Sequence, residues 1–306
     1  MSAAFHHPVP RDARVYVAGH GGLVGSAIWR HLERVGFTRL VGRRSKELDL
    51  RDREATRAFF DEVRPAYVID AAARVGGIFA NSTHPAGFLS DNLRIQLNLL
   101  DAAHEFGVER FLFLGSSCIY PKFAPQPIRE DALLTGPLEP TNDAYAIAKI
   151  AGVMQVQALR REHGRSYVSA MPTNLYGPGD NFEIPGAHVI PMLMRRMHEA
   201  KERGDPEFTI YGTGTPRREF LHTDDLAAAC LLLLERYDDD APINVGCGTD
   251  VTIDELAHLI ADVVGYQGSF VHDASKPDGT PRKVLDVSRI RALGWSPTVA
   301  LADGLA

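Results

Sequence analysis

The chain has 306 residues, of which 45% are hydrophobic and 24% charged, and its formal net charge is −6. This composition is typical of a globular protein with one large domain or two unequal ones, and the negative charge argues against a nucleic-acid-binding surface. The longest wholly apolar run, 226–234, is far shorter than the ~20 residues of a membrane-spanning helix. We therefore expect neither a nucleic acid nor a membrane among the partners of this chain.

The ends of the chain and its cysteines indicate the compartment. Residues 1–14 contain two His and two Pro but no apolar core, so we expect a loose extension rather than a secretory signal. The three cysteines, Cys118, Cys230 and Cys247, are too few and too scattered for a disulfide framework or a zinc site. These features predict a cytoplasmic protein without a bound metal. The chain stops at Ala306, inside a segment that resembles the start of a helix.

From Arg14 onward, short β-prone runs alternate with helical periodicity. Strands are expected at 15–18, 39–41, 67–70, 111–114 and 168–171, with a helix over 23–35. Such alternation predicts an α/β fold, a Rossmann-type doubly wound parallel sheet. Beyond about residue 175, Gly, Pro and Arg become denser, which indicates a smaller, interleaved C-terminal lobe that binds substrate. We expect the first domain at 14–175, with segments around 220–246 returning to it, and the lobe mainly at 176–306.

A glycine-rich turn follows the first predicted strand and opens the first predicted helix. Glycines at 19, 22 and 25 would let the backbone turn tightly and approach a pyrophosphate, while the helix N-terminus offers free N–H groups. Three glycines alone also fit a purely structural turn, but their place between strand and helix favours a dinucleotide site. The expected cofactor contacts are Gly19, Gly22, Leu23, Val24 and Gly25.

The end of the second predicted strand bears on the choice between NAD and NADP. NAD sites usually carry an acidic residue there, whereas this chain has Arg43 and Arg44. Guanidinium groups suit a 2′-phosphate, so the pattern favours NADP, although a solvated basic loop is the alternative.

Tyr145 and Lys149 stand four residues apart, a spacing that puts both side chains on one face of a helix. A lysine ammonium beside a tyrosine is expected to lower the pKa of the phenol, which could then exchange a proton with a carbonyl or alcohol oxygen. Ser116, after a predicted buried strand, would donate a hydrogen bond to the same substrate oxygen. This tyrosine–lysine–serine set resembles that of the short-chain dehydrogenases/reductases, and the glycine spacing resembles their extended branch.

Longer motifs sharpen this resemblance. The chain is similar to the GDP-L-fucose synthase family from about residue 15 to 301, in the segments 115–122 (GSSCIYPK), 139–142 (EPTN), 145–152 (YAIAKIAG), 171–178 (MPTNLYGP), 188–191 (HVIP) and 278–283 (DGTPRK). The resemblance implies a homodimer-forming NADPH-dependent enzyme that epimerises GDP-4-keto-6-deoxy-D-mannose at C3 and C5 and reduces the C4 ketone to give GDP-L-fucose.

The resemblance also implies catalytic roles. Inverting a centre beside a ketone needs a base on one face and an acid on the other, and the family assigns these jobs to the positions of Cys118 and His188. Tyr145, supported by Ser116 and Lys149, would protonate the C4 oxygen. Outside these motifs a single Cys or His is more often structural, so both roles rest on the resemblance.

The remaining contacts are carried over by position. Further cofactor contacts are implied at Leu114, Gly115, Ser116, Ser117, Lys149, Pro172, Asn174, Leu175 and His188. GDP contacts are implied at Arg196, Tyr211, Arg218 and Asp278, although the arginine pairs could equally form a charged surface. Gly21 stands where the family pattern has a basic residue, which leaves the 2′-phosphate to Arg43 and Arg44.

Two other functions remain open on the sequence. One is a related GDP-4-keto-hexose reductase or epimerase that performs only part of this reaction sequence, and the other is a non-catalytic NADP-binding sensor. The dimer is expected by analogy, through the amphipathic segment 93–106 and the helix that carries Tyr145.

Overall fold

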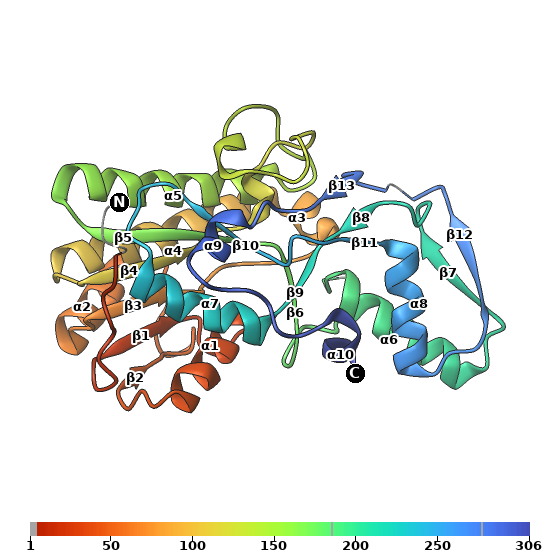
Figure 1. Ribbon diagram of the computed structural model, residues 1–306, viewed down its shortest axis with the longest axis horizontal. Helices are drawn as coiled ribbons and strands as arrows, with labels where there is room; N and C mark the ends of the chain where they lie inside the picture. The colour runs from red at the N-terminus through yellow and green to blue at the C-terminus, as the bar shows by residue number, and fades with distance from the viewer. Residues whose placement is uncertain (1–4, 185, 277) are drawn as a thin grey trace.

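The computed structural model describes residues 5–184, 186–276 and 278–306. Its larger part is built on a six-stranded parallel sheet with the order β10-β5-β4-β3-β1-β2 (Figure 1). The strands are β1 (Val15–Ala18), β2 (Leu40–Val41), β3 (Tyr67–Asp70), β4 (Arg110–Leu114), β5 (Ser166–Pro172) and β10 (Ile243–Val245). Every residue of β1, β3, β4 and β10 is buried, as expected for parallel strands covered on both faces.

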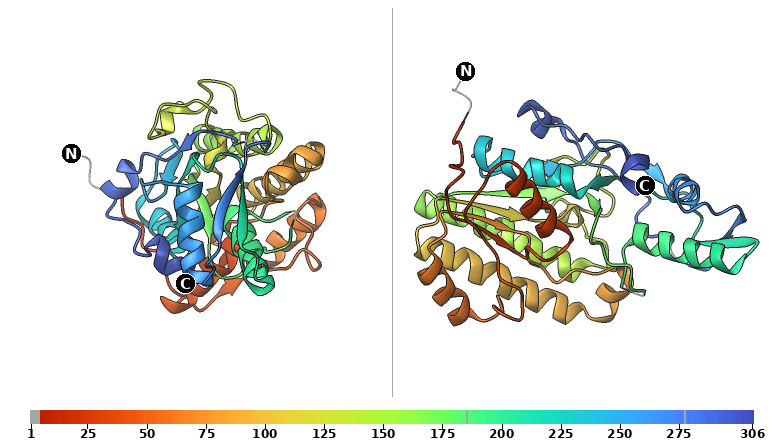
Figure 2. Two further views of the ribbon diagram at one scale, coloured as in Figure 1. Left: turned by 90° about the vertical axis from the view of Figure 1, so that its right-hand side faces the viewer. Right: turned by 90° about the horizontal axis from the view of Figure 1, so that it is seen from below.

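Two layers of helices cover this sheet (Figure 2). On one side α1 (Leu23–Arg34) packs against α7 (Thr223–Arg236), and on the other α4 packs against both α2 and α5. These helices are α2 (Arg53–Val63), α4 (Pro85–Glu105) and α5 (Asp143–His163). α4 begins with a proline at its first turn, and α5 ends at Gly164 in the left-handed conformation. The predicted α/β class and doubly wound parallel sheet are confirmed.

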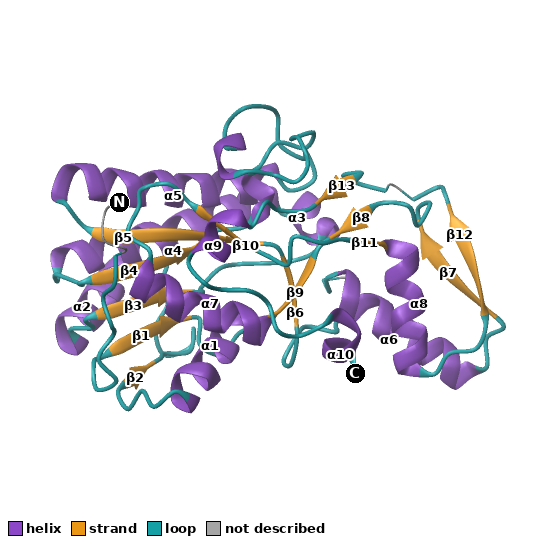
Figure 3. Cartoon of the chain, in the orientation of Figure 1, coloured by secondary structure: helices purple, strands orange, loops and turns teal. Residues whose placement is uncertain are grey.

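The smaller part has its own hydrophobic cluster between α6 (Val189–Arg203) and α8 (Ile253–Val264), on the right of Figure 3. Short strands surround these two helices: β7 (Glu207–Tyr211) pairs with β12 (Ser269–Asp273), and β8 (Arg217–Arg218) lies between β11 (Val251–Thr252) and β13 (Arg282–Lys283). β6 (Asn174–Tyr176) pairs with β9 (Phe220–His222) between the two parts. The remaining short helices are α3 (Ile78–Thr83), η1 (Ser117–Ile119), η2 (Glu130–Ala132), α9 (Ser288–Ala292) and α10 (Leu301–Leu305).

A buried carboxyl group ties the two parts together. Glu219, between β8 and β9, is fully buried. Its two carboxyl oxygens accept hydrogen bonds from the backbone N–H groups of Gly248, at 2.6 Å, and Leu285, at 2.9 Å. Three segments that are distant in the sequence are thus connected through one side chain.

The N-terminal extension differs from its prediction. Within the described residues 5–14, Val9 is buried, the backbone N–H of His7 donates to Glu235 O at 2.8 Å, and the guanidinium of Arg110 lies 4.5 Å from the ring centroid of Phe5. The expectation of a loose extension is therefore wrong for residues 5–14, because their apolar and aromatic side chains find partners on the sheet domain. Residues 1–4 of that prediction lie outside the described residues.

Candidate active site

A cavity of about 1150 Å³ opens at the carboxyl ends of β1, β3, β4 and β5 and extends onto the smaller part. In an open α/β sheet, ligands bind outside these strand ends, where the strand order reverses; here that point lies between β1 and β3. A pocket for one drug-sized ligand occupies roughly 300–1,000 Å³, so this cavity has room for more than one small ligand.

The glycine turn forms one end of the cavity. Gly19 has φ +75°, a left-handed conformation that favours glycine, and a Cβ there would lie 2.8 Å from Ala71 O. Gly19, Gly22, Leu23 and Val24 line the cavity. Gly25 does not: it is buried in the first turn of α1, where an added Cβ would clash with Gly19 O. Gly25 therefore permits close packing of the helix beneath the turn instead of forming the cavity wall.

These residues fit a dinucleotide phosphate. Among the described residues no side chain caps the N-terminus of α1 and its first turn carries no acidic group, so N–H groups remain available to an anion. Arg43 and Arg44 follow β2 and line the same cavity. Arg43 lies 5.5 Å from the ring centroid of Phe59, and the backbone N–H of Arg44 donates to Glu47 at 2.7 Å. Two cationic side chains at this end of the cavity could thus hold a 2′-phosphate.

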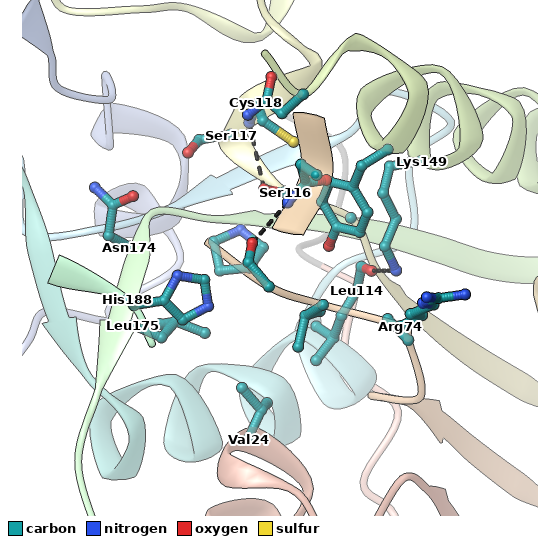
Figure 4. A pocket seen from close by; sticks show the side chains of 18 of the residues that line it. Val24, Arg74, Leu114, Ser116, Ser117, Cys118, Lys149, Asn174, Leu175 and His188 are labelled. Atoms are coloured by element: carbon teal, nitrogen blue, oxygen red, sulfur yellow. Dashed lines mark hydrogen bonds between the residues drawn. The ribbon is translucent and has the colours of Figure 1, made fainter. Parts of the chain in front are cut away.

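Ser116 and Cys118 occupy the short segment after β4. Ser116 is the N-cap of η1, and its Oγ accepts a hydrogen bond from the backbone N–H of Cys118 at 3.3 Å. Both side chains line the cavity (Figure 4). Cys118 is buried except for a small exposed fraction. The 3₁₀ turn therefore presents a hydroxyl and a thiol to the same space.

Tyr145 and Lys149 lie one turn apart near the start of α5, as predicted. The ammonium of Lys149 is buried and donates to Leu114 O at 2.8 Å, a contact drawn in Figure 4. It lies 4.8 Å from the ring centroid of Phe113 and 6.0 Å from that of Tyr145. α5 thus places a phenol and an ammonium over the carboxyl end of β4.

The expected lowering of the Tyr145 pKa is wrong for this arrangement. Burial of the phenol raises the pKa of Tyr145 above its ordinary value, and neighbouring Cys118 and Asp70 add to the rise. Burial also lowers the pKa of Lys149, which Asp70 partly opposes. The reason is that desolvation is the largest cause of both shifts, and the ammonium is bonded to Leu114 O rather than to the phenol.

His188 reaches the cavity from the smaller part. It precedes α6 as its N-cap residue, and it lines the cavity on the side away from Lys149 in the view of Figure 4. The segment before it is docked against the first part, because the backbone N–H of Gly77 donates to Gly186 O at 3.3 Å. A Cβ on Gly77 would lie 2.9 Å from Ala187 O. A close backbone contact therefore sets the position of His188.

The structure gathers most of the predicted site residues around this one cavity. All five predicted catalytic residues line it, as does every predicted cofactor residue except Gly25. Of the four predicted GDP contacts only Arg218 lines the cavity.

The other three predicted GDP contacts lie farther out on the smaller part. The guanidinium of Arg196 stacks 4.2 Å from the ring centroid of Tyr211, and its Nη2 donates to Thr209 O at 2.7 Å. Within the described residues, Nη1 of Arg196 is buried without a hydrogen-bond partner. Asp278 accepts from the backbone N–H and hydroxyl of Thr213, at 2.7 and 2.9 Å. These three residues thus contact one another or neighbouring residues of the smaller part, and none of them lines the cavity.

Several cavity residues escaped the sequence analysis. Glu139 accepts from Lys122 Nζ at 3.0 Å and from the hydroxyl of Thr280 at 3.3 Å, so it connects the two parts at the cavity wall. Arg74 lines the cavity four residues after the end of β3 and pairs with Asp91 at 2.9 Å. The position of Arg74 just after a predicted strand is a signal in the sequence from which this cavity residue could have been predicted. Thr280 and Glu139 meet only through the tertiary fold.

The described residues also bear on metal binding and on membrane insertion. No group of three or more His, Cys, Asp or Glu residues among them could hold a metal ion. None of the described helices is long and apolar enough to span a bilayer.

Comparison with known proteins agrees with this geometry. Residues 15–246 match the NAD dependent epimerase/dehydratase family. GDP-L-fucose synthase 1 of Arabidopsis thaliana is 57% identical over 295 residues, which cover 96% of this chain and 91% of that protein. GDP-L-fucose synthase of Escherichia coli is 54% identical over 302 residues, 96% of this chain and 94% of that protein. A solved GDP-L-fucose synthetase from Naegleria fowleri bound to NADP superimposes with a TM-score of 0.91 at 31% identity, over 99% of this chain and 93% of that one. The chain therefore belongs to the NAD-dependent epimerase/dehydratase family, in its GDP-L-fucose synthase branch.

Proposed function

We propose that this chain is an NADPH-dependent enzyme that epimerises GDP-4-keto-6-deoxy-D-mannose at C3 and C5 and reduces it at C4, giving GDP-L-fucose. The observation that carries the proposal is the shared cavity: Tyr145, Lys149 and Ser116 line the same space as Cys118 and His188. One set suits reduction of a ketone and the other suits proton exchange beside it. The relatives named GDP-L-fucose synthase support the same assignment.

For reduction, the residues of this chain handle the proton. Tyr145 would donate a proton to the C4 oxygen, while Ser116 would hold that oxygen by a hydrogen bond and Lys149 would supply positive charge beside the phenol. When bound, NADPH supplies the hydride. The residues that would hold it are Gly19, Gly22, Leu23, Val24, Arg43, Arg44, Leu114, Gly115, Ser117, Pro172, Asn174 and Leu175.

For epimerisation, a base and an acid must act on opposite faces of the sugar. The thiolate of Cys118 would remove the proton from the carbon beside the ketone, which leaves an enolate. The imidazolium of His188 would return a proton to the opposite face and so invert the centre. The two residues come from different parts of the fold, η1 and the start of α6, which supports a position on either side of a bound sugar.

The GDP group would lie toward the smaller part. Arg218 lines the cavity, while Arg196, Tyr211 and Asp278 extend from it along the same part. Arginine binds phosphate oxygens through two parallel hydrogen bonds, and the exposed ring of Tyr211 offers a face on which a base can stack.

The first test is turnover in deuterated water with NADPH and GDP-4-keto-6-deoxy-D-mannose, followed by NMR of the product. We expect deuterium at both C3 and C5 of GDP-L-fucose. A reduced product that lacks deuterium at one of these carbons would instead support a narrower reductase or epimerase. Cofactor binding without any turnover would support a sensor.

A variant series separates the two chemistries. Cys118→Ser should abolish deuterium exchange at C3 and C5, while NADPH oxidation with a substrate that needs only C4 reduction continues. Cys247→Ser is a matched control, because Cys247 lies outside the main cavity and donates to Phe220 O at 3.0 Å, a contact that serine can keep. Loss of exchange in both variants would show a structural effect rather than a catalytic one.

We also propose a homodimer formed through α4 and α5. Three large apolar side chains on these adjacent helices are exposed: Leu97 at 38%, Ile147 at 46% and Met154 at 42%. Ile147 and Met154 stand seven residues apart and so share one face of α5, and exposed apolar groups on one face often mark an interface. Sedimentation should give a dimer mass for the parent chain and a monomer mass for Met154→Glu, whereas a parent monomer would contradict the proposal.

Two further assignments belong to the same proposal. Three free cysteines are consistent with a reducing compartment, so we propose a cytoplasmic location, which cell fractionation would test.

We also propose the division of the chain into a cofactor-binding domain at 14–175, with 220–246 returning to it, and a substrate-binding lobe mainly at 176–306. The two hydrophobic clusters support this division in outline, although Leu285, Val287, Ile290 and Trp295 pack in the cluster of the sheet domain.

A further inference from the structure

Asp70 is a buried carboxyl group at the end of β3 to which the proposed reaction assigns no role. Its side chain is completely buried (0% exposed). Oδ1 accepts a hydrogen bond from the backbone N–H of Ala72 at 3.0 Å, whereas Oδ2 has no hydrogen-bond partner among the described residues. An isolated buried carboxylate is costly, and buried charges are normally paired. A nearby cation is therefore expected to face Asp70.

The register of the sheet supplies the geometry. Asp70 pairs with Phe113 across the parallel strands β3 and β4, so both side chains lie on the same face of the sheet. That face is covered by α5, because a Cβ on Gly152 of α5 would clash with the ring of Phe113. Lys149 of α5 places its ammonium 4.8 Å from the same ring. Asp70 and Lys149 are therefore neighbours across one aromatic side chain.

The other groups around Asp70 do not neutralise it. Tyr16 of β1 lies on the same face, and its buried hydroxyl has no hydrogen-bond partner among the described residues. The buried residues of α4 are all uncharged. The charge of Asp70 also acts on Tyr145 of α5, and Cys118 of η1 acts on both Tyr145 and Lys149. Arg43, after β2, acts on Tyr16. Among the described residues, Lys149 is thus the cation that acts directly on the carboxyl of Asp70.

We propose that Asp70 is a positioning residue of the reduction site, whose carboxylate keeps Lys149 protonated and directed toward the end of β4 beside Tyr145. The inference rests on the proposed function, since Lys149 supports proton donation by Tyr145. It adds a residue that reaches neither substrate nor cofactor, because Asp70 does not line the cavity.

The need for such a residue follows from the surroundings of Lys149. Its one hydrogen-bond acceptor among the described residues is a neutral backbone carbonyl, Leu114 O. Burial lowers the pKa of Lys149, and the carboxylate of Asp70 opposes this effect. In turn, burial raises the pKa of Asp70 to about 6, although Lys149 acts in the opposite direction. Asp70 is thus ionised near neutral pH, where its charge opposes the loss of the Lys149 proton, and it loses this charge as the pH falls through about 6.

The decisive measurement is the titration of Lys149 in the whole protein without ligands, by NMR of lysine labelled with ¹³C at Cε. Loss of one resonance in Lys149→Met assigns the signal. In Asp70→Asn, which keeps an acceptor for the Ala72 N–H, we expect the pKa of Lys149 to fall by about 1 or more. Asp49→Asn is the control, because Asp49 lies on the cavity wall but pairs with Arg51 at 2.8 Å. Equal titration of Lys149 in the parent and in Asp70→Asn would overturn the proposal.

Two further readouts keep the test independent of folding and of turnover. In the parent chain alone, the Lys149 resonance should show a second step near pH 6, when Asp70 titrates. The absence of that step would contradict the proposal even if Asp70→Asn does not fold. In turnover, Asp70→Asn should lower kcat at pH 7 about tenfold with little change in KM, and it should remove the acid limb near pH 6. Since the titration needs no substrate, failure of the proposed function would leave that result intact.

Discussion

The two parts of this molecule present their functional side chains in different ways. In the sheet domain, the candidate catalytic and cofactor residues come from strand ends and from the start of α5, and they meet in one cavity. In the smaller part, the predicted GDP residues are spread over α6, β7 and the segment before β13, and only Arg218 reaches the cavity wall. Parallel topology brings the carboxyl ends of all strands to one edge of the sheet. In the smaller part, the positions of the side chains depend instead on pairing between segments that are distant in sequence, such as β7 with β12.

The largest effect is expected where the sheet domain contributes directly to chemistry. Tyr145→Phe removes the proton donor without changing the ring that packs at the start of α5. We expect NADPH oxidation to fall by about 10²- to 10⁴-fold, while deuterium exchange at C3 and C5 continues. Stopped-flow fluorescence of NADPH together with NMR of the substrate measures both. A loss of exchange equal to the loss of reduction would mean that the two chemistries share Tyr145.

The glycine turn offers a test of packing in the same domain. Gly25→Ala should destabilise the fold by about 2–3 kcal/mol, because the added Cβ would clash with Gly19 O at the start of α1. Gly21→Ala is the matched control, since no atom of the described residues lies within 4 Å of a Cβ at that position. Urea unfolding of both variants, with NADPH binding by fluorescence, measures the difference. Equal stability of the two variants would contradict the close-packing role of Gly25.

The same contrast explains how much could be predicted from sequence. The alternation of strands and helices, the glycine turn and the Tyr145–Lys149 spacing are local patterns, and each corresponds to the observed element. The contact of Glu139 with Thr280 joins positions far apart in the chain, so no local sequence pattern predicts it. The N-terminal extension and the direction of the Tyr145 pKa were mispredicted because both depend on burial by other elements. Asp70 escaped notice for the same reason.

The pH dependence of stability probes Asp70 in the absence of any ligand. Burial raises the pKa of Asp70 to about 6 in the folded state from an ordinary value near 3.8. A group with a raised folded-state pKa stabilises the fold fully below its unfolded pKa and loses that contribution as the pH rises through its folded pKa. From pH 4 to pH 7, Asp70→Asn should therefore gain about 2–3 kcal/mol relative to the parent. Urea unfolding at both pH values measures this gain, and a constant difference between the two proteins would contradict it.

The junction between the two parts should respond more moderately. Glu219→Gln replaces one carboxyl oxygen by an N–H donor that faces the backbone N–H of Gly248 or Leu285. We expect a loss of about 1–3 kcal/mol in the free energy of unfolding. Glu207→Gln on the exposed start of β7 is the control and should change stability by less than about 0.5 kcal/mol. If both substitutions had equally small effects, Glu219 would not connect the two parts energetically.

The smallest effect tests the division between the two binding regions most directly. Tyr211→Ala should weaken GDP binding about tenfold, because base stacking on an aromatic ring contributes roughly 1–3 kcal/mol, and it should leave NADPH binding unchanged. Arg44→Ala should have the opposite effect: it should weaken NADPH binding and leave GDP binding unchanged. It should also leave the binding of NADH unchanged, because NADH lacks the 2′-phosphate. Calorimetric titration of both variants with each nucleotide measures the full set. If Tyr211→Ala also weakened NADPH binding, the two parts would act as one coupled site. The GDP-binding and NADPH-binding residues would then be separate in position but not in their contributions to the binding free energy.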